Sequence, residues 1–168
     1  MNRLLRILKH RWLDETDAHR ALNDAAVDRL EARVATSEKR HTGEIRVCVE
    51  AGLPLSYLWR DARARERAVM MFGKLRVWDT EANNGVLIYV LLAEHAIEIV
   101  ADRGVARAVP QAHWDGIVAG MREAFRAGRF EEGINAAVDA VDAQLRQHFP
   151  LRAGAPNPNE LPDRPVRR

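Results

Sequence analysis

The stretch VLIYVLLAEHAIEIVAD, residues 86–102, decides the fold of this sequence. It begins with seven apolar residues in a row, Val86 to Leu92, and a strand without polar positions is expected to be covered on both faces. A short connection at Glu94 and His95 leads to a second strand-like run, AIEIVAD. We expect the two runs to pair as an antiparallel hairpin, with the first strand in the middle of a sheet.

A third strand is predicted upstream, in EIRVCVE at residues 44–50. Apolar and polar side chains alternate along it from Ile45 to Glu50, which is the period of a strand. Residues 57–72, between this strand and the apolar run, are predicted to form one helix that ends at Gly73. Because strands joined through a helix run parallel, the first two strands should form a parallel pair.

Three further helices are predicted from apolar residues that recur every three or four positions. The first covers residues 22–36 and has Asn23 or Asp24 as its N-cap. The other two run from Trp114 to Gly128 and from Phe130 to Leu145. The sequence therefore predicts an α/β fold, in which a small mixed sheet (a parallel β-α-β unit plus an antiparallel hairpin) is sandwiched between helices.

The two ends of the chain differ in composition from residues 21–149, which we expect to form the α/β/α domain. Residues 1–20 are predicted to form a basic amphipathic helix, with apolar side chains every four positions from Leu4 to Trp12. This helix could lie on an anionic membrane or dock on its own domain, and we favour docking because one short helix is a weak anchor. Residues 150–168 contain five of the seven prolines, so we expect an extended tail without helix or sheet.

The composition excludes several classes of protein. A chain of 168 residues with 47% hydrophobic and 30% charged residues fits one globular domain and excludes general disorder. The 26 basic and 24 acidic residues are interleaved, as in residues 60–67, so we predict no nucleic-acid partner. The sequence shows no secretory signal and no apolar run that could span a membrane, and Cys48 is its only cysteine. We therefore expect a cytoplasmic protein.

Topology predicts that three polar segments meet at one end of the sheet. Parallel strands linked by a helix begin at the same end, and the hairpin returns the end of the third strand to it. His41 and Glu44 precede the first strand, VWDTEANNG at residues 77–85 precedes the second, and Asp102 to Gly104 follow the third. We expect these three segments to cluster.

The expected cluster offers the ligands that a hard cation prefers. Asp79 and Asp102 carry carboxylates, and Thr80, Asn83 and Asn84 carry neutral oxygens, the donor types that Ca²⁺ and Mg²⁺ bind. The same residue types often cap helices and shape turns, and this alternative needs no ligand.

Signals for catalysis are weaker. The sequence contains neither a phosphate-binding loop nor the G-x-S-x-G motif of a serine hydrolase. Ser37 or Thr80 as a nucleophile would need an activating base that the sequence does not place. Acid–base pairs of His41 with Glu44 or of Asp102 with Arg103 are conceivable, although ordinary ion pairs are far commoner.

Several of these motifs occur together, and in the same order, in a known family. The segments at residues 41–50, 65–80, 81–92, 97–105, 114–117 and 130–134 resemble the TPM domain family, and the similarity covers about residues 25–149. The resemblance implies a small sheet between helices. It further implies divalent-cation binding or weak acid phosphatase activity, which have been associated with some members, and a partner of the LemA-type membrane proteins, whose genes often lie beside bacterial members.

The motifs that stand at the polar end of the family pattern are W-D-T at residues 78–80, N-N-G at 83–85 and A-D-R-G at 101–104. Carried over onto this chain, they imply two sets of residues. The expected metal ligands are Asp79, Thr80, Asn84 and Asp102, and the expected ligand contacts are Asn83, Arg103 and Gly104.

We therefore predict a noncatalytic binding module that holds Ca²⁺ or Mg²⁺, uses no organic cofactor and engages a membrane-associated protein. Two alternatives stay open: a weak metal-assisted phosphatase, and a structural adaptor that acts through the N-terminal helix. Many members carry a signal peptide and a membrane helix or Gly-rich tail that this sequence lacks. This difference favours a cytoplasmic form, peripheral to the inner face of the membrane.

Overall fold

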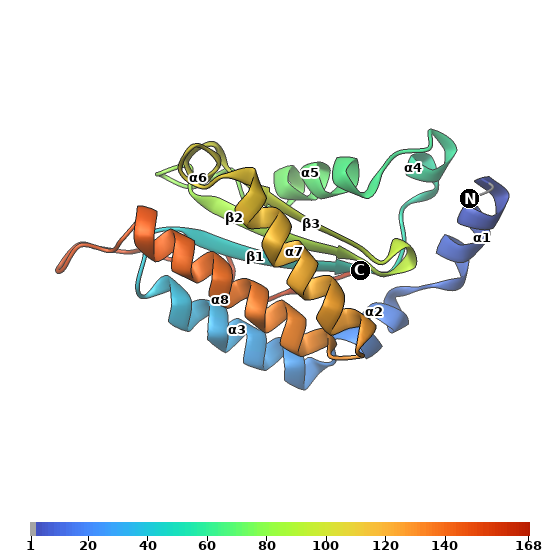
Figure 1. The fold of residues 1–168 in the computed structure, drawn as a ribbon, viewed down its shortest axis with the longest axis horizontal. Helices are drawn as coiled ribbons and strands as arrows, with labels where there is room; N and C mark the ends of the chain where they lie inside the picture. The colour runs from blue at the N-terminus through green and yellow to red at the C-terminus, as the bar shows by residue number, and fades with distance from the viewer. Residues whose placement is uncertain (1–2) are drawn as a thin grey trace.

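The computed structural model describes residues 3–168 and is built around a four-stranded sheet in the order β3-β2-β1-β4 (Figure 1). β1 and β2 are parallel, and β2 and β3 form the antiparallel hairpin, so the predicted mixed sheet is confirmed. β4 adds to the free edge of β1 in parallel. The strands are β1 (Glu44–Glu50), β2 (Gly85–Leu91), β3 (Ala96–Ala101) and β4 (Val166–Arg167).

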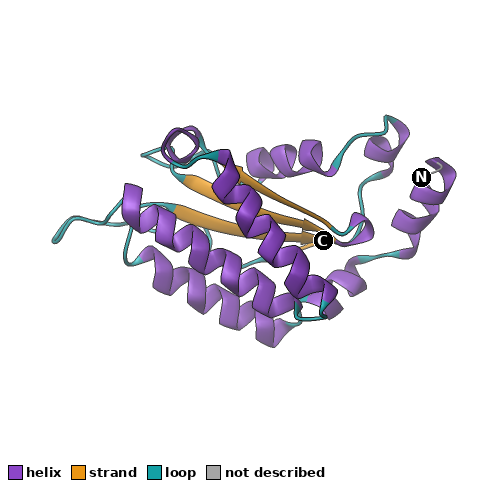
Figure 2. Ribbon diagram, viewed as in Figure 1, coloured by secondary structure: helices purple, strands orange, loops and turns teal. Residues whose placement is uncertain are grey.

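Helices cover both faces of the sheet, as Figure 2 shows. One face carries α2 (Glu15–Ala21), α3 (Asp24–Glu38), α6 (Arg103–Ala108), α7 (Gln111–Arg126) and α8 (Phe130–His148). The other carries α4 (Leu55–Trp59) and α5 (Ala64–Lys74), with α1 (Arg3–Trp12) beside α4. The short 3₁₀ helix η1 (Leu92–Glu94) lies in the hairpin connection. No helix in the described part of the chain is both long and apolar enough to cross a lipid bilayer.

The central position of β2 follows from its side chains. Val86, Ile88 and Val90 are buried against the face that carries α3, α7 and α8, whereas Leu87 and Tyr89 are buried against the α5 face. Burial of both faces requires apolar residues at every position, which is the pattern read from the sequence.

The polar positions of β1 are buried as well, although their alternation is typical of a strand with one exposed face. Glu50 accepts hydrogen bonds from Arg67 Nε on α5 at 2.8 Å and from the Tyr89 hydroxyl at 2.7 Å. Buried ions are tolerated when they are paired and hydrogen-bonded in this way. The structure therefore places a buried Arg–Glu pair between α5 and the sheet.

The single helix predicted over residues 57–72 is wrong, because the structure has two helices there. Asp61 has a left-handed φ of 54°, which ends the first helix, and the backbone N–H of Arg63 then donates to Glu66 Oε1 at 3.0 Å in the first turn of the second. The predicted stop at Gly73 is also wrong, since α5 continues to Lys74. The buried apolar residues that recur at helical spacing, Ala64, Ala68 and Met71, all lie after the break, so their periodicity did not show where the helix begins.

The prediction that the C-terminal tail forms no sheet is wrong for its last residues. After Pro165 the chain regains backbone donors, and the backbone N–H of Arg168 donates to the Val49 carbonyl at 2.9 Å. The Ala51 backbone N–H in turn donates to the Arg168 carbonyl at 2.7 Å. The tail thus closes the exposed edge of β1.

Candidate functional site

The three polar segments meet where β1 and β2 begin and β3 ends, near α6 in Figure 1. Glu44 pairs with Gly85 across the parallel strands. The backbone N–H of Asp102 donates to the Gly85 carbonyl at 2.9 Å. We call this end of the sheet, formed by the segments at residues 41–44, 79–85 and 102–104, the rim.

Asn83, Arg103 and Gly104 form one side of the rim. The backbone N–H of Gly104 donates to the Asn83 carbonyl at 2.9 Å, and Arg103 Nη2 donates to Asn83 Oδ1 at 2.5 Å. A Cβ atom on Gly104 would lie only 2.6 Å from the Asn83 carbonyl oxygen, so this approach requires glycine. The structure therefore brings together the three residues predicted as ligand contacts.

Asn84 and Thr80 form the centre of the rim. The Asn84 backbone N–H donates to Thr80 Oγ1 at 3.0 Å, and Asn84 Nδ2 donates to the Thr42 carbonyl at 2.9 Å. Asn84 is fully buried, yet its Oδ1 accepts no hydrogen bond from any described residue. Thr42 was not among the predicted site residues, although its position directly before the first strand could have indicated it.

Asp102 completes the rim and is 6% exposed. Its Oδ1 accepts the Arg103 backbone N–H at 2.6 Å and caps α6. Its Oδ2 is buried and has no hydrogen-bond partner in the described chain. Buried oxygens are usually partnered, because an unmet acceptor costs about 1–3 kcal/mol. Capping therefore explains one oxygen of this carboxylate and leaves the other without a role.

Asp79, the second predicted carboxylate, is directed away from the rest of the rim. Its side chain is 41% exposed and forms an ion pair with Arg76. None of its hydrogen bonds or ion pairs reaches Asp102, Asn84 or Thr80 among the residues described. Residues 3–168 also contain no cluster of three or more His, Cys, Asp or Glu side chains arranged to hold a metal. A cation at the rim would therefore rest on one carboxylate and on neutral oxygens.

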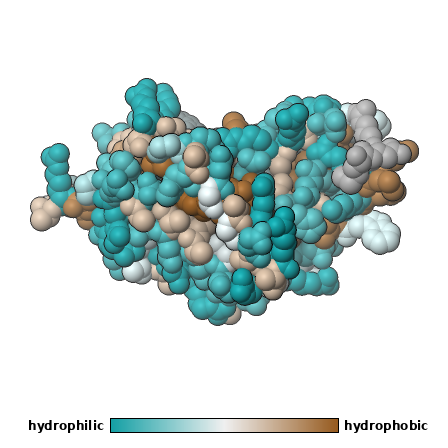
Figure 3. Space-filling view, viewed as in Figure 1, coloured by the Kyte–Doolittle hydropathy of each residue, from teal (hydrophilic) through white to brown (hydrophobic). Residues whose placement is uncertain are grey.

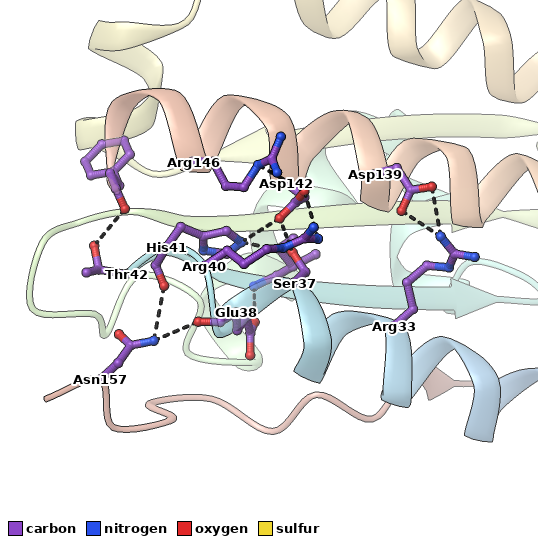
Figure 4. A network of polar contacts seen from close by, with 12 residues as sticks. Arg33, Ser37, Glu38, Arg40, His41, Thr42, Asp139, Asp142, Arg146 and Asn157 are labelled. Carbon is purple, nitrogen blue, oxygen red and sulfur yellow. Dashed lines mark hydrogen bonds and ion pairs between the residues drawn. The ribbon is translucent and has the colours of Figure 1, made fainter. Parts of the chain in front are cut away.

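A second polar network, next to the rim, links α3 to α8 (Figure 4). Ser37 Oγ donates to Asp142 Oδ1 at 2.9 Å and lies 2.9 Å from His41 Nε2. Since the hydroxyl proton goes to Asp142, His41 Nε2 donates to Ser37 and His41 Nδ1 carries no proton. His41 Nδ1 is buried without a partner in the described structure.

This network contains the residue types of a serine hydrolase but not their arrangement. In a catalytic triad the carboxylate holds the imidazole nitrogen opposite the serine, whereas Asp142 approaches His41 Nε2, at 3.5 Å, on the side of Ser37. Ser37 is also buried inside a helix and cannot reach a substrate. The network is therefore structural, and His41 bonds to Ser37 rather than to Glu44.

Burial shifts the pKa values of the acids and the histidine near the rim. It lowers the pKa of His41 to about 4, although Asp142 acts in the opposite direction. It raises the pKa of Glu38 to about 9, with the Glu44 carboxyl adding to the shift. The pKa of Glu44 rises to about 7, because burial outweighs two hydrogen bonds from backbone N–H groups of the tail at Glu160 and Leu161.

Sequence reasoning missed this network, although one signal was present. Asp142 lies beside Val141 and four residues after Val138, within the apolar stripe of the last helix. A charged residue in a buried stripe requires partners.

The chain is similar to known structures and to one family. Among solved structures it resembles the NMR structure of the BA42 protein from the psychrophilic bacterium Bizionia argentinensis, with 26% sequence identity and a TM-score of 0.75 over 86% of this chain and 94% of that one. It also resembles the N-terminal domain of a protein from P. gingivalis, with 19% identity and a TM-score of 0.61 over 78% of this chain and 82% of that one, a likeness of fold alone. No curated protein matches the sequence. A family model described as the TPM domain matches residues 16–144.

Proposed function

Because this chain belongs to the TPM domain family, we propose that it is a noncatalytic binding module whose rim holds a divalent cation. One observation carries the proposal: Asp102 Oδ2 and Asn84 Oδ1 are both buried at the rim without a hydrogen-bond donor from the described residues. A carboxylate oxygen and an amide oxygen are the ligands that Ca²⁺ and Mg²⁺ bind. A bound cation is a partner that either atom could accept.

The ligand set predicts weak binding with much of the coordination sphere left to water. Affinity for Ca²⁺ rises with the number of charged ligands, and Asp102 is the only carboxylate in the set. We expect a dissociation constant on the order of 10⁻⁴ M or weaker. Mg²⁺, which retains several waters, should compete at this site. Asp79 stays outside the set because its carboxylate pairs with Arg76.

Titration of the protein with Ca²⁺ and with Mg²⁺, followed by amide NMR shifts, tests the proposal. Asp102→Asn is the informative variant, since asparagine also caps helices well and removes only the charge. We expect the shifts of residues 83–85 and 102–104 to saturate in the wild type and to be lost in this variant.

Asp79→Asn is the matched control, because it removes a carboxylate from the same loop outside the proposed ligand set. Its titration should match that of the wild type. The proposal fails if the wild type shows no saturable shift at the rim, or if Asp102→Asn binds the ions unchanged.

A metal-assisted phosphatase is the second candidate. The name of the matching family model refers to a phosphatase, and the exposed Arg103 guanidinium lies at the rim with its Nε 3.8 Å from Asp102 Oδ1. An arginine in that place could bind a phosphoryl oxygen while the cation polarises another. Hydrolysis of an aryl phosphate that disappears in both Asp102→Asn and Arg103→Gln would support catalysis. Activity that survives both substitutions would indicate a contaminating enzyme.

The protein partner is proposed from the family resemblance alone. We propose a membrane-associated protein of the LemA type, as the resemblance implies. Cross-linking of the full chain to such a protein, with and without Ca²⁺, addresses this part.

A further inference from the structure

Helix α1 is docked on the domain through the polar side chains of Arg6 and His10 and through Ile7, which is half-buried. Arg6 donates from Nε to Glu94 Oε1 at 2.7 Å, from Nη1 to Asp61 at 2.6 Å and from Nη2 to the Ala62 carbonyl at 2.6 Å. His10 is buried, accepts the Leu53 backbone N–H on Nδ1 at 2.9 Å, and contacts Glu94 through Nε2 at 3.0 Å. Most amphipathic helices of a domain face the core with their apolar side, whereas α1 leaves most of its apolar side chains outside.

Four of the apolar side chains of α1 face outward. Leu5 is 59% exposed, Leu8 55% and Trp12 87%. Of the eight large apolar side chains that are exposed in residues 3–168, six lie on α1 and the neighbouring α4. We call these six the apolar end surface: Leu4, Leu5, Leu8, Trp12, Leu55 and Trp59. In Figure 3 hydrophobic atoms gather at the end of the molecule where Figure 1 places α1.

Cations border this surface. At 100° per residue, Lys9 and Arg11 fall on opposite sides of the stripe that runs through Leu8 and Trp12. Both are exposed, and α1 contains no acidic residue. Leucine and tryptophan flanked by lysine and arginine is the pattern of helices that lie in a membrane interface.

We propose that the apolar end surface docks on an anionic lipid bilayer, with Leu8 and Trp12 inserted between lipids and Lys9 and Arg11 against the headgroups. The charge favours lipid over a second copy of this chain, since two copies facing each other through α1 would bring cations together without an acidic residue of α1 between them. The inference is independent of the cation site.

The docking of α1 through Arg6 and His10 determines which side of the helix faces the bilayer. These two residues and Leu8 lie on opposite sides of the same helix, so α1 can hold the domain and a bilayer at once without unfolding. The sequence left membrane binding and domain docking as alternatives. The geometry makes them compatible.

Co-sedimentation of the full chain with vesicles tests the proposal. We expect binding to vesicles that contain phosphatidylglycerol, much weaker binding to pure phosphatidylcholine, and several-fold loss at high salt. The double variant Leu8→Gln with Trp12→Ser should bind the anionic vesicles at least about tenfold more weakly.

Val69→Ser with Trp78→Ser is the matched control, because it removes two exposed apolar side chains that lie outside the apolar end surface. We expect it to bind like the wild type. Circular dichroism should show both double variants folded, as all four side chains are at least half exposed.

Three outcomes would overturn the proposal: no binding to anionic vesicles, equal binding to neutral vesicles, or equal loss in the control. Concentration-dependent dimerisation that Leu8→Gln with Trp12→Ser abolishes, without vesicle binding, would assign the surface to a second copy instead.

Discussion

Acidification should remove the contribution that the neutral His41 ring makes to stability. The pKa of the buried imidazole falls from 6.5 to about 4 in the folded state, because burial disfavours the charged ring. At His41 the unfolded chain then binds more protons than the folded one between these two values, so this contribution to stability is fully present above 6.5 and is lost as the pH falls towards 4. The full shift corresponds to about 3 kcal/mol, of which about 2 kcal/mol is lost between about pH 7 and about pH 5.

The structure explains why the charged ring is disfavoured. A doubly protonated His41 would place a hydrogen on Nδ1, which is buried without a hydrogen-bond partner in the described structure, and the nearby Gly43 backbone offsets burial only in part. Asp142 attracts the charge, but Arg40 Nη2 at 3.0 Å and Arg146 Nε at 3.5 Å already share its carboxylate. The carboxylate therefore offsets only part of the effect of burial.

The assay is urea unfolding at a series of pH values for the wild type and for His41→Gln, whose amide can still donate to Ser37. Glu38 and Glu44 have raised pKa values, so their contribution has the opposite sign and stability increases as each becomes protonated. Subtracting the two curves removes this shared contribution and isolates His41. His19→Gln, at an exposed helix position, is the control and should follow the wild type.

The expected result is a difference in unfolding free energy that shrinks by about 2 kcal/mol from about pH 7 to about pH 5. Curves of His41→Gln and wild type that run parallel over this range would refute the reasoning. The pKa of His41 in the folded protein would then equal its value in the unfolded chain.

Three further changes have definite expected outcomes. Gly104→Ala should destabilise the protein by about 1–3 kcal/mol in urea unfolding and weaken Ca²⁺ binding, because the new Cβ would force the Asn83 carbonyl and α6 apart. Unchanged stability would contradict the close approach of Gly104 to Asn83. Tyr89→Phe should cost about 2 kcal/mol in the same assay, since it removes a buried hydrogen bond to the charged Glu50. Deleting residues 166–168 should lower the melting temperature by about 5 °C in calorimetry and increase aggregation, because the β1 edge loses its backbone partners. A truncated protein that stays stable and monomeric would contradict this role of β4.

The sheet could be predicted from the sequence because its signal is local. A continuous apolar run, as in Val86–Leu91, or a strict alternation, as in residues 44–50, reflects how a strand meets its two faces. The break at Asp61 is held by backbone hydrogen bonds of its own turn but has no glycine to mark it. The pairing of Arg168 with Val49 joins segments far apart in the sequence, so no local pattern shows it.

The rim was predictable as a meeting of loops but not in its atomic detail. Parallel and antiparallel pairing alone bring Asp102 to Gly85 and hence next to Asn84. Whether a carboxylate turns inward depends on its nearest partner, and Asp79 has Arg76 three residues before it. Residue type therefore identified the candidate ligands, while only the structure separated Asp102 from Asp79.

The rim and the apolar end surface lie at opposite ends of β1, and this separation yields one last prediction. β1 begins at the rim with Glu44, whereas His10 of α1 binds the backbone at Leu53, just beyond the end of the strand. Seven residues of strand span roughly 20 Å, so a cation at the rim cannot bridge to headgroups under α1. Vesicle binding should therefore be the same with Ca²⁺ and with a chelator, and the same for Asp102→Asn as for the wild type. Calcium-dependent sedimentation that Asp102→Asn abolishes would show that the rim itself contacts the lipid, and the proposed orientation on the membrane would be wrong.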